Sequence, residues 1–228
     1  MDGLGIVDLY STKGLEYLLV IGFLLLFTIV WVFLSREERP ASAVAPRRLR
    51  GSEWFRLDEG RFYHQGHTWA RPEASGIVSV GIDDFAQKLL GRPSSLNLPK
   101  VGARVTEGEQ GWNVSTRSGS VDMLSPVTGQ VVAVNPDVLK SPELLEQDPY
   151  ESWLVRVQVP RMRPALRNLL SGKLANAWME ETVATLRERM AGNLGTVLQD
   201  GGEPVSGFAA NLAPEDWEAF AAEFLLTN

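Results

Sequence analysis

The sequence of 228 residues contains no cysteine and only two histidines, His64 and His67. Without cysteine the chain cannot form disulfides, thiolate nucleophiles, cysteine-ligated zinc sites or cysteine-held iron–sulfur clusters. Two histidines are too few for most metal sites unless carboxylates complete the ligand set. The sequence also has no GxxxxGK phosphate loop and no GxGxxG dinucleotide motif. We therefore predict no metal site and no cofactor.

The net charge of the chain bears on whether it binds nucleic acid. The formal net charge is -6 at pH 7, which gives no electrostatic reason to expect a nucleic-acid partner.

One long stretch, from Tyr17 to Leu34, carries no charged side chain and reads YLLVIGFLLLFTIVWVFL. At about 1.5 Å of rise per residue, a helix of this run would be roughly 27 Å long, close to the ~30 Å hydrocarbon core of a bilayer. We predict a transmembrane helix over residues 17–35, with aromatic and basic side chains at its two interfaces. The residues expected at the membrane interfaces are Tyr17, Trp31, Arg36 and Arg39.

Three other interpretations account for part of this apolar run. A buried core helix would normally show a polar face, and this run offers only Gly22 and Thr28. A cleaved signal peptide is suggested by the Ala-x-Ala triplets at 41–45, but these lie beyond four charges and too far from the apolar run. A helix that packs in a membrane bundle stays open, because Gly22 would allow the close approach of a neighbouring subunit.

The flanking charges predict the orientation of the span. Lys13 precedes it, whereas five arginines follow it between Arg36 and Arg50, so the positive-inside tendency puts the C-terminal domain in the cytoplasm. We expect residues 1–16 to be a short extracytoplasmic segment and 36–53 to be a basic linker, either touching anionic headgroups or serving as a solvated tether. The predicted location is a bacterial-type inner or cytoplasmic membrane, crossed once.

From Trp54 onward the pattern changes to short strands separated by Gly and Pro turns. Strands are predicted at 77–81, 131–134 and 153–159, where apolar and polar residues alternate in the last of these. Between them, Asp83 to Leu90 has helical spacing, with Gly91 suited to its C-terminal cap. This order of elements predicts a small, mainly β sandwich or flattened barrel with short helices.

Several segments carry a specific resemblance. They are HTW at 67–69, VSVGIDDFAQKLLG at 78–91, LPKVGARVTEGE at 98–109, and DMLSPVTGQVVAVNPDVLKSPELLEQDPYESWLVRV at 122–157. In this order they resemble the glycine-cleavage H protein, from near Phe62 to near Trp178. The resemblance implies a lipoyl/biotinyl-carrier type of fold, a barrel-sandwich hybrid, which we assign to residues 54–178.

The same resemblance implies a lipoyl-lysine at the tip of a β-hairpin, seven residues before the Ser-Pro of the SPV turn. Counting back from Ser125 reaches Ser118, and no lysine occurs between Lys100 and Lys140. A serine hydroxyl cannot form the amide that lipoylation requires, and an arginine guanidinium is too weakly nucleophilic at neutral pH. We therefore predict a degenerate relative that has lost its lipoyl attachment site.

No other pattern predicts catalysis. Ser118 has no base beside it in sequence, although His67 could approach it in space. The adjacent Asp83 and Asp84 lie where a helix N-terminus favours acids, so capping is preferred to a catalytic carboxylate pair. For His67, packing or hydrogen bonding is preferred to metal binding.

Residues 179–228 form an extension beyond the resemblance. Met179, Val183, Leu186 and Met190 make one apolar stripe of a helix expected to end at Gly192, and Asp200–Gly202 suits a turn. A last helix is expected to start at Pro214. Its aromatic residues are Trp217, Phe220 and Phe224. This face either covers the domain's own core or docks a partner.

The predicted chain has an apolar anchor and a carrier-like domain that lacks the lysine. Without that lysine it cannot carry lipoate, so we expect it to act by binding other molecules. We predict a protein that is not an enzyme and has no catalytic residue: a structural or assembly subunit of a multi-subunit membrane complex, such as a respiratory or photosynthetic electron-transfer complex. Its partners would be membrane lipids and other integral membrane subunits, with no small-molecule substrate. The alternatives are a membrane-tethered carrier and a regulatory binder that docks glycine-cleavage enzymes through the helix at 83–90.

Overall fold

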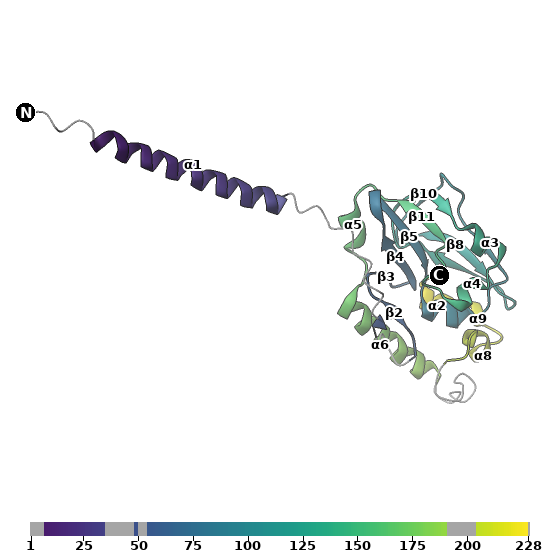
Figure 1. Ribbon diagram of the computed structural model, residues 1–228. Coiled ribbons are helices and arrows are strands. Elements are labelled where there is room, and N and C mark those ends of the chain that lie inside the picture. The colour runs from purple at the N-terminus through teal and green to yellow at the C-terminus, as the bar shows by residue number, and fades with distance from the viewer. Residues whose placement is uncertain (1–6, 35–47, 50–53, 191–203, 228) are drawn as a thin grey trace, which may run out of the picture. The chain divides into compact units, whose positions relative to one another are not determined.

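The computed structural model describes residues 7–34, 48–49, 54–190 and 204–227. The chain divides into two compact units, Met1–Val44 and Ala45–Asn228 (Figure 1). The predicted interface residues Arg36 and Arg39 and the predicted turn at 200–202 lie outside the described residues.

The first unit contains helix α1, Val7–Leu34, which begins ten residues before the predicted start at Tyr17. The described side chains between Tyr17 and Thr28 are all exposed, and a Cβ added at Gly22 would meet no atom within 4 Å. The side chain of Trp31 is outside the described set. In the part of the chain that the structure describes, no helix has the length and hydrophobicity needed to cross a membrane.

The second unit is built on antiparallel sheets, as the turn-rich pattern predicts. A six-stranded sheet has the order β3-β4-β5-β11-β10-β7, and a three-stranded sheet has the order β6-β8-β9. The strands of the first are β3 Phe62–His64, β4 Thr68–Pro72, β5 Ile77–Ile82, β11 Val155–Gln158, β10 Gly129–Val134 and β7 Arg104–Val105. Those of the second are β6 Ser95–Asn97, β8 Gln110–Ser115 and β9 Ser120–Leu124, and a short pair joins β1 Arg48–Leu49 to β2 Leu57–Asp58.

The three predicted strands correspond to β5, β10 and β11. In β11, Val155 and Val157 are buried while Arg156 and Gln158 face outward, as the alternation predicts. Leu154 departs from the alternation, because it is fully buried although it is adjacent to the buried Val155. Leu154 precedes β11, and its N–H donates to the carbonyl of Val80 at 2.8 Å. The alternation of side chains along the strand therefore does not determine which way the Leu154 side chain points.

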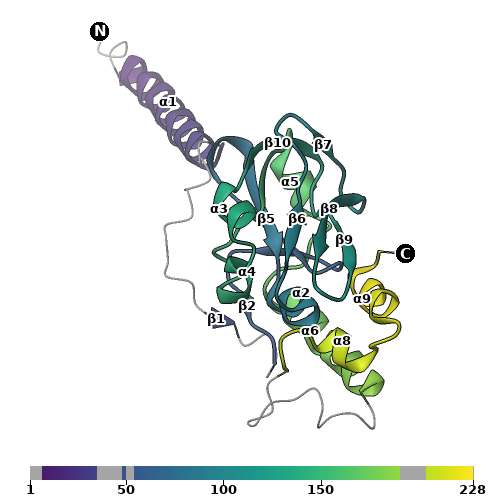
Figure 2. The ribbon, with the colours of Figure 1, turned by 90° about the vertical axis from the view of Figure 1, so that its right-hand side faces the viewer.

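Short helices surround the sheets (Figure 2). They are the 3-10 turn η1 Ala74–Gly76 and the α-helices α2 Asp84–Leu90, α3 Pro136–Lys140, α4 Leu144–Gln147, α5 Met162–Leu166, α6 Gly172–Arg189, α8 Phe208–Leu212 and α9 Trp217–Leu225. Helix α6 ends at Arg189, not at the predicted Gly192. Helix α9 begins at Trp217 rather than Pro214, because the N–H of Asp216 bonds the carbonyl of Ala213 at 3.1 Å and closes a turn first.

Helix α2 starts as the sequence predicts, with Asp83 as its N-cap. One carboxylate oxygen of Asp83 accepts from the N–H of Ala86 at 2.8 Å, and the other lies 2.8 Å from Nδ1 of His67. His67 has the left-handed backbone conformation, with φ of 57°. Its ring stacks on Phe85 at 4.0 Å between centroids, so His67 packs and hydrogen-bonds as expected. Asp83 thus holds a helix end and a strained residue together.

Phe85 joins the carrier-like domain to the C-terminal extension. Its ring centroid lies 4.8 Å from that of Phe55, 6.0 Å from Phe208 and 5.5 Å from Phe224. Trp217 and Phe224 are buried, and Phe220 packs against the same core. These three aromatic residues therefore cover the domain's own core, which is the first of the two alternatives for this helix face.

Truncating Phe208 tests whether the extension is part of the folded domain. Phe208→Ala should lower the free energy of unfolding by about 3–5 kcal/mol, because it removes a fully buried ring and leaves a cavity. Urea unfolding of the full chain, followed by tryptophan fluorescence, measures the change. Phe220→Ala is the control and should cost clearly less, since Phe220 is only partly buried. Equal, small effects of both changes would contradict this packing.

Two substitutions separate the roles of Asp83. Asp83→Ala should cost about 2–4 kcal/mol, because it removes the helix cap and leaves the buried His67 ring without its partner. Asp83→Asn keeps an oxygen acceptor for Ala86 and should cost about 1 kcal/mol. The same unfolding measurement distinguishes them, and equal losses would mean that the cap contributes little.

Candidate functional site

The β8–β9 hairpin presents Ser118 at its tip. The last strand pair is Ser115 with Ser120, and the turn between them is closed by a bond from the N–H of Thr116 to the carbonyl of Gly119 at 2.7 Å. The N–H of Ser118 donates to Oγ1 of Thr116 at 3.2 Å, and the Ser118 residue is exposed. The structure therefore places Ser118 in the exposed turn at the tip of the hairpin.

The extension reaches this tip through helix α9, which lies beside β9 (Figure 2). Nε1 of Trp217 donates to the carbonyl of Ser118 at 2.5 Å, and the N–H of Ser120 donates to Oε1 of Glu218 at 3.3 Å. Gly119, between them, has φ of +148°, and a Cβ there would overlap both the Trp217 ring and the Glu218 carboxylate. The hairpin tip is therefore fixed by side chains about 100 residues further along the chain.

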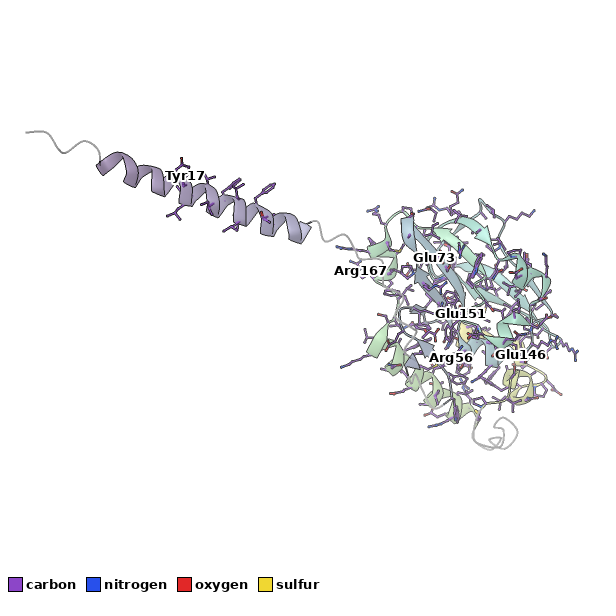
Figure 3. The ribbon with its side chains drawn as sticks, in the orientation of Figure 1. Tyr17, Arg56, Glu73, Glu146, Glu151 and Arg167 are labelled. Atoms are coloured by element: carbon purple, nitrogen blue, oxygen red, sulfur yellow. The ribbon has the colours of Figure 1, made fainter. Side chains whose placement is uncertain are left out.

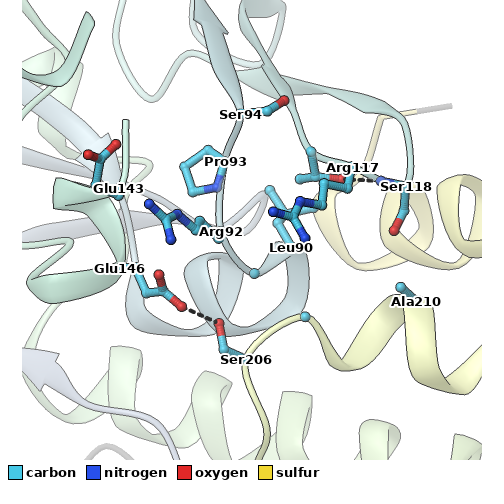
Figure 4. Close-up of a pocket in the computed structure, with 13 residues that line it drawn as sticks. Leu90, Arg92, Pro93, Ser94, Arg117, Ser118, Glu143, Glu146, Ser206 and Ala210 are labelled. Atoms are coloured by element: carbon cyan, nitrogen blue, oxygen red, sulfur yellow. Dashed lines mark hydrogen bonds between the residues drawn. The ribbon is translucent and has the colours of Figure 1, made fainter. Parts of the chain in front are cut away.

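A cavity of about 590 Å³ opens beside the tip, between the end of α2, the hairpin, α4 and the extension (Figure 4). Guanidinium groups come from Arg92 and Arg117, and carboxylates come from Glu143 and Glu146. Glu146 accepts from the hydroxyl of Ser206 at 3.3 Å. The cavity thus offers both charge signs, and its lining contains no histidine.

His67 lines a different cavity of about 220 Å³, together with Trp178, Thr182 and Phe224. The structure therefore does not bring Ser118 and His67 together, and the hydroxyl of Ser118 has no histidine base in its own cavity. The partner of His67 is Asp83, whose second oxygen is committed to capping α2. Ser118 and His67 thus line separate cavities, and the ring of His67 is bonded to Asp83.

Asp84, the second acid of the predicted pair, is also structural. Its carboxylate accepts from the N–H of Arg56 at 2.8 Å and lies 3.2 Å from Nζ of Lys88. Burial raises its pKa above the usual range of an aspartate, and the cation of Lys88 opposes that shift. Within the described ranges, no three histidine, aspartate or glutamate side chains cluster as metal ligands would.

A buried cation is a feature that the sequence pattern does not reveal. Arg61 is only 4% exposed, and its guanidinium lies 4.2 Å from the Trp69 ring and 3.4 Å from the carboxylate of Asp58. Tyr150 flanks the same group at 5.1 Å. Desolvation lowers the pKa of Arg61, but the stacked rings and Asp58 favour the charged form. The cluster of Arg61, Asp58, Trp69 and Tyr150 stabilises the fold and does not line the cavity beside the hairpin.

Sequence reasoning also misses two residues near the tip. Glu218 accepts from the N–H of Ser120, and Arg92 lines the adjoining cavity. Neither belongs to a local motif, because their positions depend on packing between distant segments. The available signal is the glycine after Ser118, because a residue without a Cβ beside a hairpin tip is consistent with close approach by another segment.

Comparisons with known proteins agree with the residues quoted above. The family model described as "Glycine cleavage H-protein" matches residues 61–182. A probable glycine cleavage system H protein of Thermococcus gammatolerans is 33% identical over 126 residues, which are 55% of this chain and 94% of that protein. The glycine cleavage system H protein of Methylococcus capsulatus is 44% identical over 102 residues, which are 45% of this chain and 80% of that protein.

Among solved structures, the crystal structure of a glycine cleavage system H protein from Mycobacterium marinum matches 56% of this chain and 99% of its own, at 30% identity and a TM-score of 0.48. The family match covers more than half of this chain and includes both strands of the hairpin, β8 and β9, as well as the SPV turn and helix α2. This chain belongs to the glycine cleavage H-protein family.

Proposed function

We propose that this chain is a member of the family that does not carry lipoate, and that it works by binding, as a structural or assembly subunit of a membrane complex. The observation that carries the proposal is the serine at the hairpin tip. Lipoylation joins a carboxyl group to a primary amine, and Ser118 offers a hydroxyl instead. The neighbouring Arg117 stays protonated at neutral pH and is a poor nucleophile.

The contacts of the tip support the same conclusion. A carrier arm must leave the surface and reach other enzymes, so its attachment point must be free of its own domain. Here the backbone on both sides of Gly119 is bonded to α9, through Trp217 and Glu218. A hairpin held in this way is suited to a fixed surface.

Helix α2 does not support the alternative of a regulatory binder that docks through residues 83–90. All of its residues except Lys88 are buried, and they pack beneath α8, α9 and α4. A docking helix must expose an apolar face, and the extension covers the face that this helix would offer. The burial of α2 therefore favours binding through another surface of the domain.

The proposal includes attachment to a membrane through α1. The apolar run from Tyr17 to Leu34 has the length of a bilayer core, and the described side chains of its first two thirds are exposed rather than packed. The arginines that follow the run favour a cytoplasmic C-terminal domain. Lipids and integral membrane subunits are then the expected partners, and respiratory and photosynthetic electron-transfer complexes are the assemblies to examine first.

Native purification combined with intact-mass measurement tests this function. The chain isolated from its own cells in mild detergent should have the unmodified mass of its sequence and should co-purify with integral membrane proteins in fixed ratio. An added lipoyl mass on any residue would establish a membrane-tethered carrier and refute the proposal. Recovery of the unmodified chain with soluble glycine-cleavage enzymes, without membrane subunits, would instead support a regulatory binder.

Restoring the lysine tests whether α9 blocks the tip. Ser118→Lys in the full chain should accept little or no lipoate from a lipoate–protein ligase, because α9 holds the turn. The triple change Ser118→Lys, Trp217→Ala, Glu218→Ala should accept at least tenfold more, since removing both hydrogen bonds at about 1 kcal/mol each frees the turn. Mass spectrometry measures the modified fraction. Equal modification of both variants would show that α9 is no barrier.

A further inference from the structure

One segment of this acidic chain has no acidic residue. From Ser152 to Met179 there is no aspartate or glutamate, although the whole chain has 28 acidic against 22 basic residues. The cations of this segment are Arg156, Arg161, Arg163, Arg167 and Lys173. Arg156 is paired with Glu73 at 3.4 Å, so the charge of interest lies between 161 and 173.

Three of these cations point outward from a well-packed support. Arg161, Arg167 and Lys173 are exposed, and no ion pair of theirs occurs among the described residues. Between them, Met162, Leu166 and Leu169 pack on the core. One carboxylate contacts this segment: Oε1 of Glu107 accepts a hydrogen bond from Nδ2 of Asn168 at 3.0 Å. The segment is therefore held in place by its apolar side while its charges face solvent.

A large apolar side chain stands beside these charges. Leu174, in the first turn of α6, is 69% exposed, more than any other large apolar residue described outside α1. We define Arg161, Arg167, Lys173 and Leu174 as the basic patch. Cations next to an exposed leucine are the composition that binds at a lipid surface, where headgroups take the charges and the leucine enters the interface.

The segment that carries the patch pairs with β3, an edge strand of the six-stranded sheet. Residues 54–63 lead from the linker into β3, and Tyr63 exchanges two backbone hydrogen bonds of 2.8 Å with Leu170. The patch and the entry strand therefore share one edge of the domain (Figure 1). Arg167 lies at the margin of the domain in Figure 3.

We propose that the basic patch is a second membrane contact that binds anionic lipid headgroups and fixes how the domain lies on the bilayer. The inference rests on the proposed attachment through α1. Anionic lipids enrich the cytoplasmic leaflet, on which the flanking arginines of α1 orient the domain. Docking orders the domain on the surface, which is what a subunit that builds a membrane complex requires.

The absence of cysteine gives a direct test, because a single introduced cysteine is the only labelling site. Leu174→Cys, labelled with an environment-sensitive fluorophore in the full chain, is reconstituted into vesicles of phosphatidylcholine alone or mixed with phosphatidylglycerol. The emission should shift to the blue and rise only with phosphatidylglycerol, and the shift should reverse with salt. Leu139→Cys is the control label: it is 46% exposed on α3, a helix that lies apart from α5 and α6 in Figure 1, and it should not respond.

Charge removal identifies the cause of any shift. Changing Arg161, Arg167 and Lys173 to glutamine should each lower the docked-to-undocked ratio by about fivefold, and the triple variant should lose the shift. A shift of equal size in neutral vesicles, or one that survives the triple variant, would overturn headgroup binding. So would a label that responds only when native membrane proteins are added, since that would assign the patch to an acidic protein partner.

Separate readouts distinguish failure of this inference from failure of the proposed function. Vesicle flotation reports attachment through α1, whereas the label at residue 174 reports the patch. A chain that floats without a fluorescence shift would refute the patch and leave the anchor intact. A chain that does not float would refute the anchor. If its label also failed to respond to added anionic vesicles, the lipid-contact inference would be overturned as well.

Discussion

The packing of Phe85 among Phe55, Phe208 and Phe224 is the contact on which the special features of this protein depend. Phe85 belongs to a helix of the family domain, whereas Phe208 and Phe224 belong to the extension. Burying these rings together makes the extension part of one hydrophobic core. As a result, α2 is buried beneath the extension, and α9 lies against the hairpin tip.

The same core keeps the H-protein fold together independently of the residue at the hairpin tip. The hairpin, the SPV turn and helix α2 are retained because they hold the sheets and the core together, whatever the residue at the tip. The end of the hairpin has contacts of its own, where Ser118 and Gly119 meet Trp217 and Glu218. Ser118 is exposed, so the packing of the sheets does not depend on which side chain stands there.

Local rules predicted the parts of the fold that local chemistry determines. The cap at Asp83, the end of α2 at Gly91 and the alternation in β11 follow from hydrogen bonds and periodicity within a few residues. Helix α9 starts three residues late, because a turn at Asp216 competes with the favoured proline position. Helix α8 was not predicted at all, since its five residues are defined by burial of Phe208 and not by periodicity.

The candidate site divides in the same way. Ser118 follows from counting along a hairpin whose two strands are adjacent in sequence. Glu218 and Arg92 do not, because their positions depend on packing between segments far apart in the chain. The burial of Arg61 was equally hidden, since an arginine in sequence gives no sign of the rings that will enclose it.

Gly119 has a consequence for the history of this protein. Any side chain there collides with α9, and the glycine in turn allows α9 to sit where it does. A larger residue at position 119 would have to be matched by a smaller side chain at Trp217 or Glu218. The hairpin tip and helix α9 can therefore change in evolution only together.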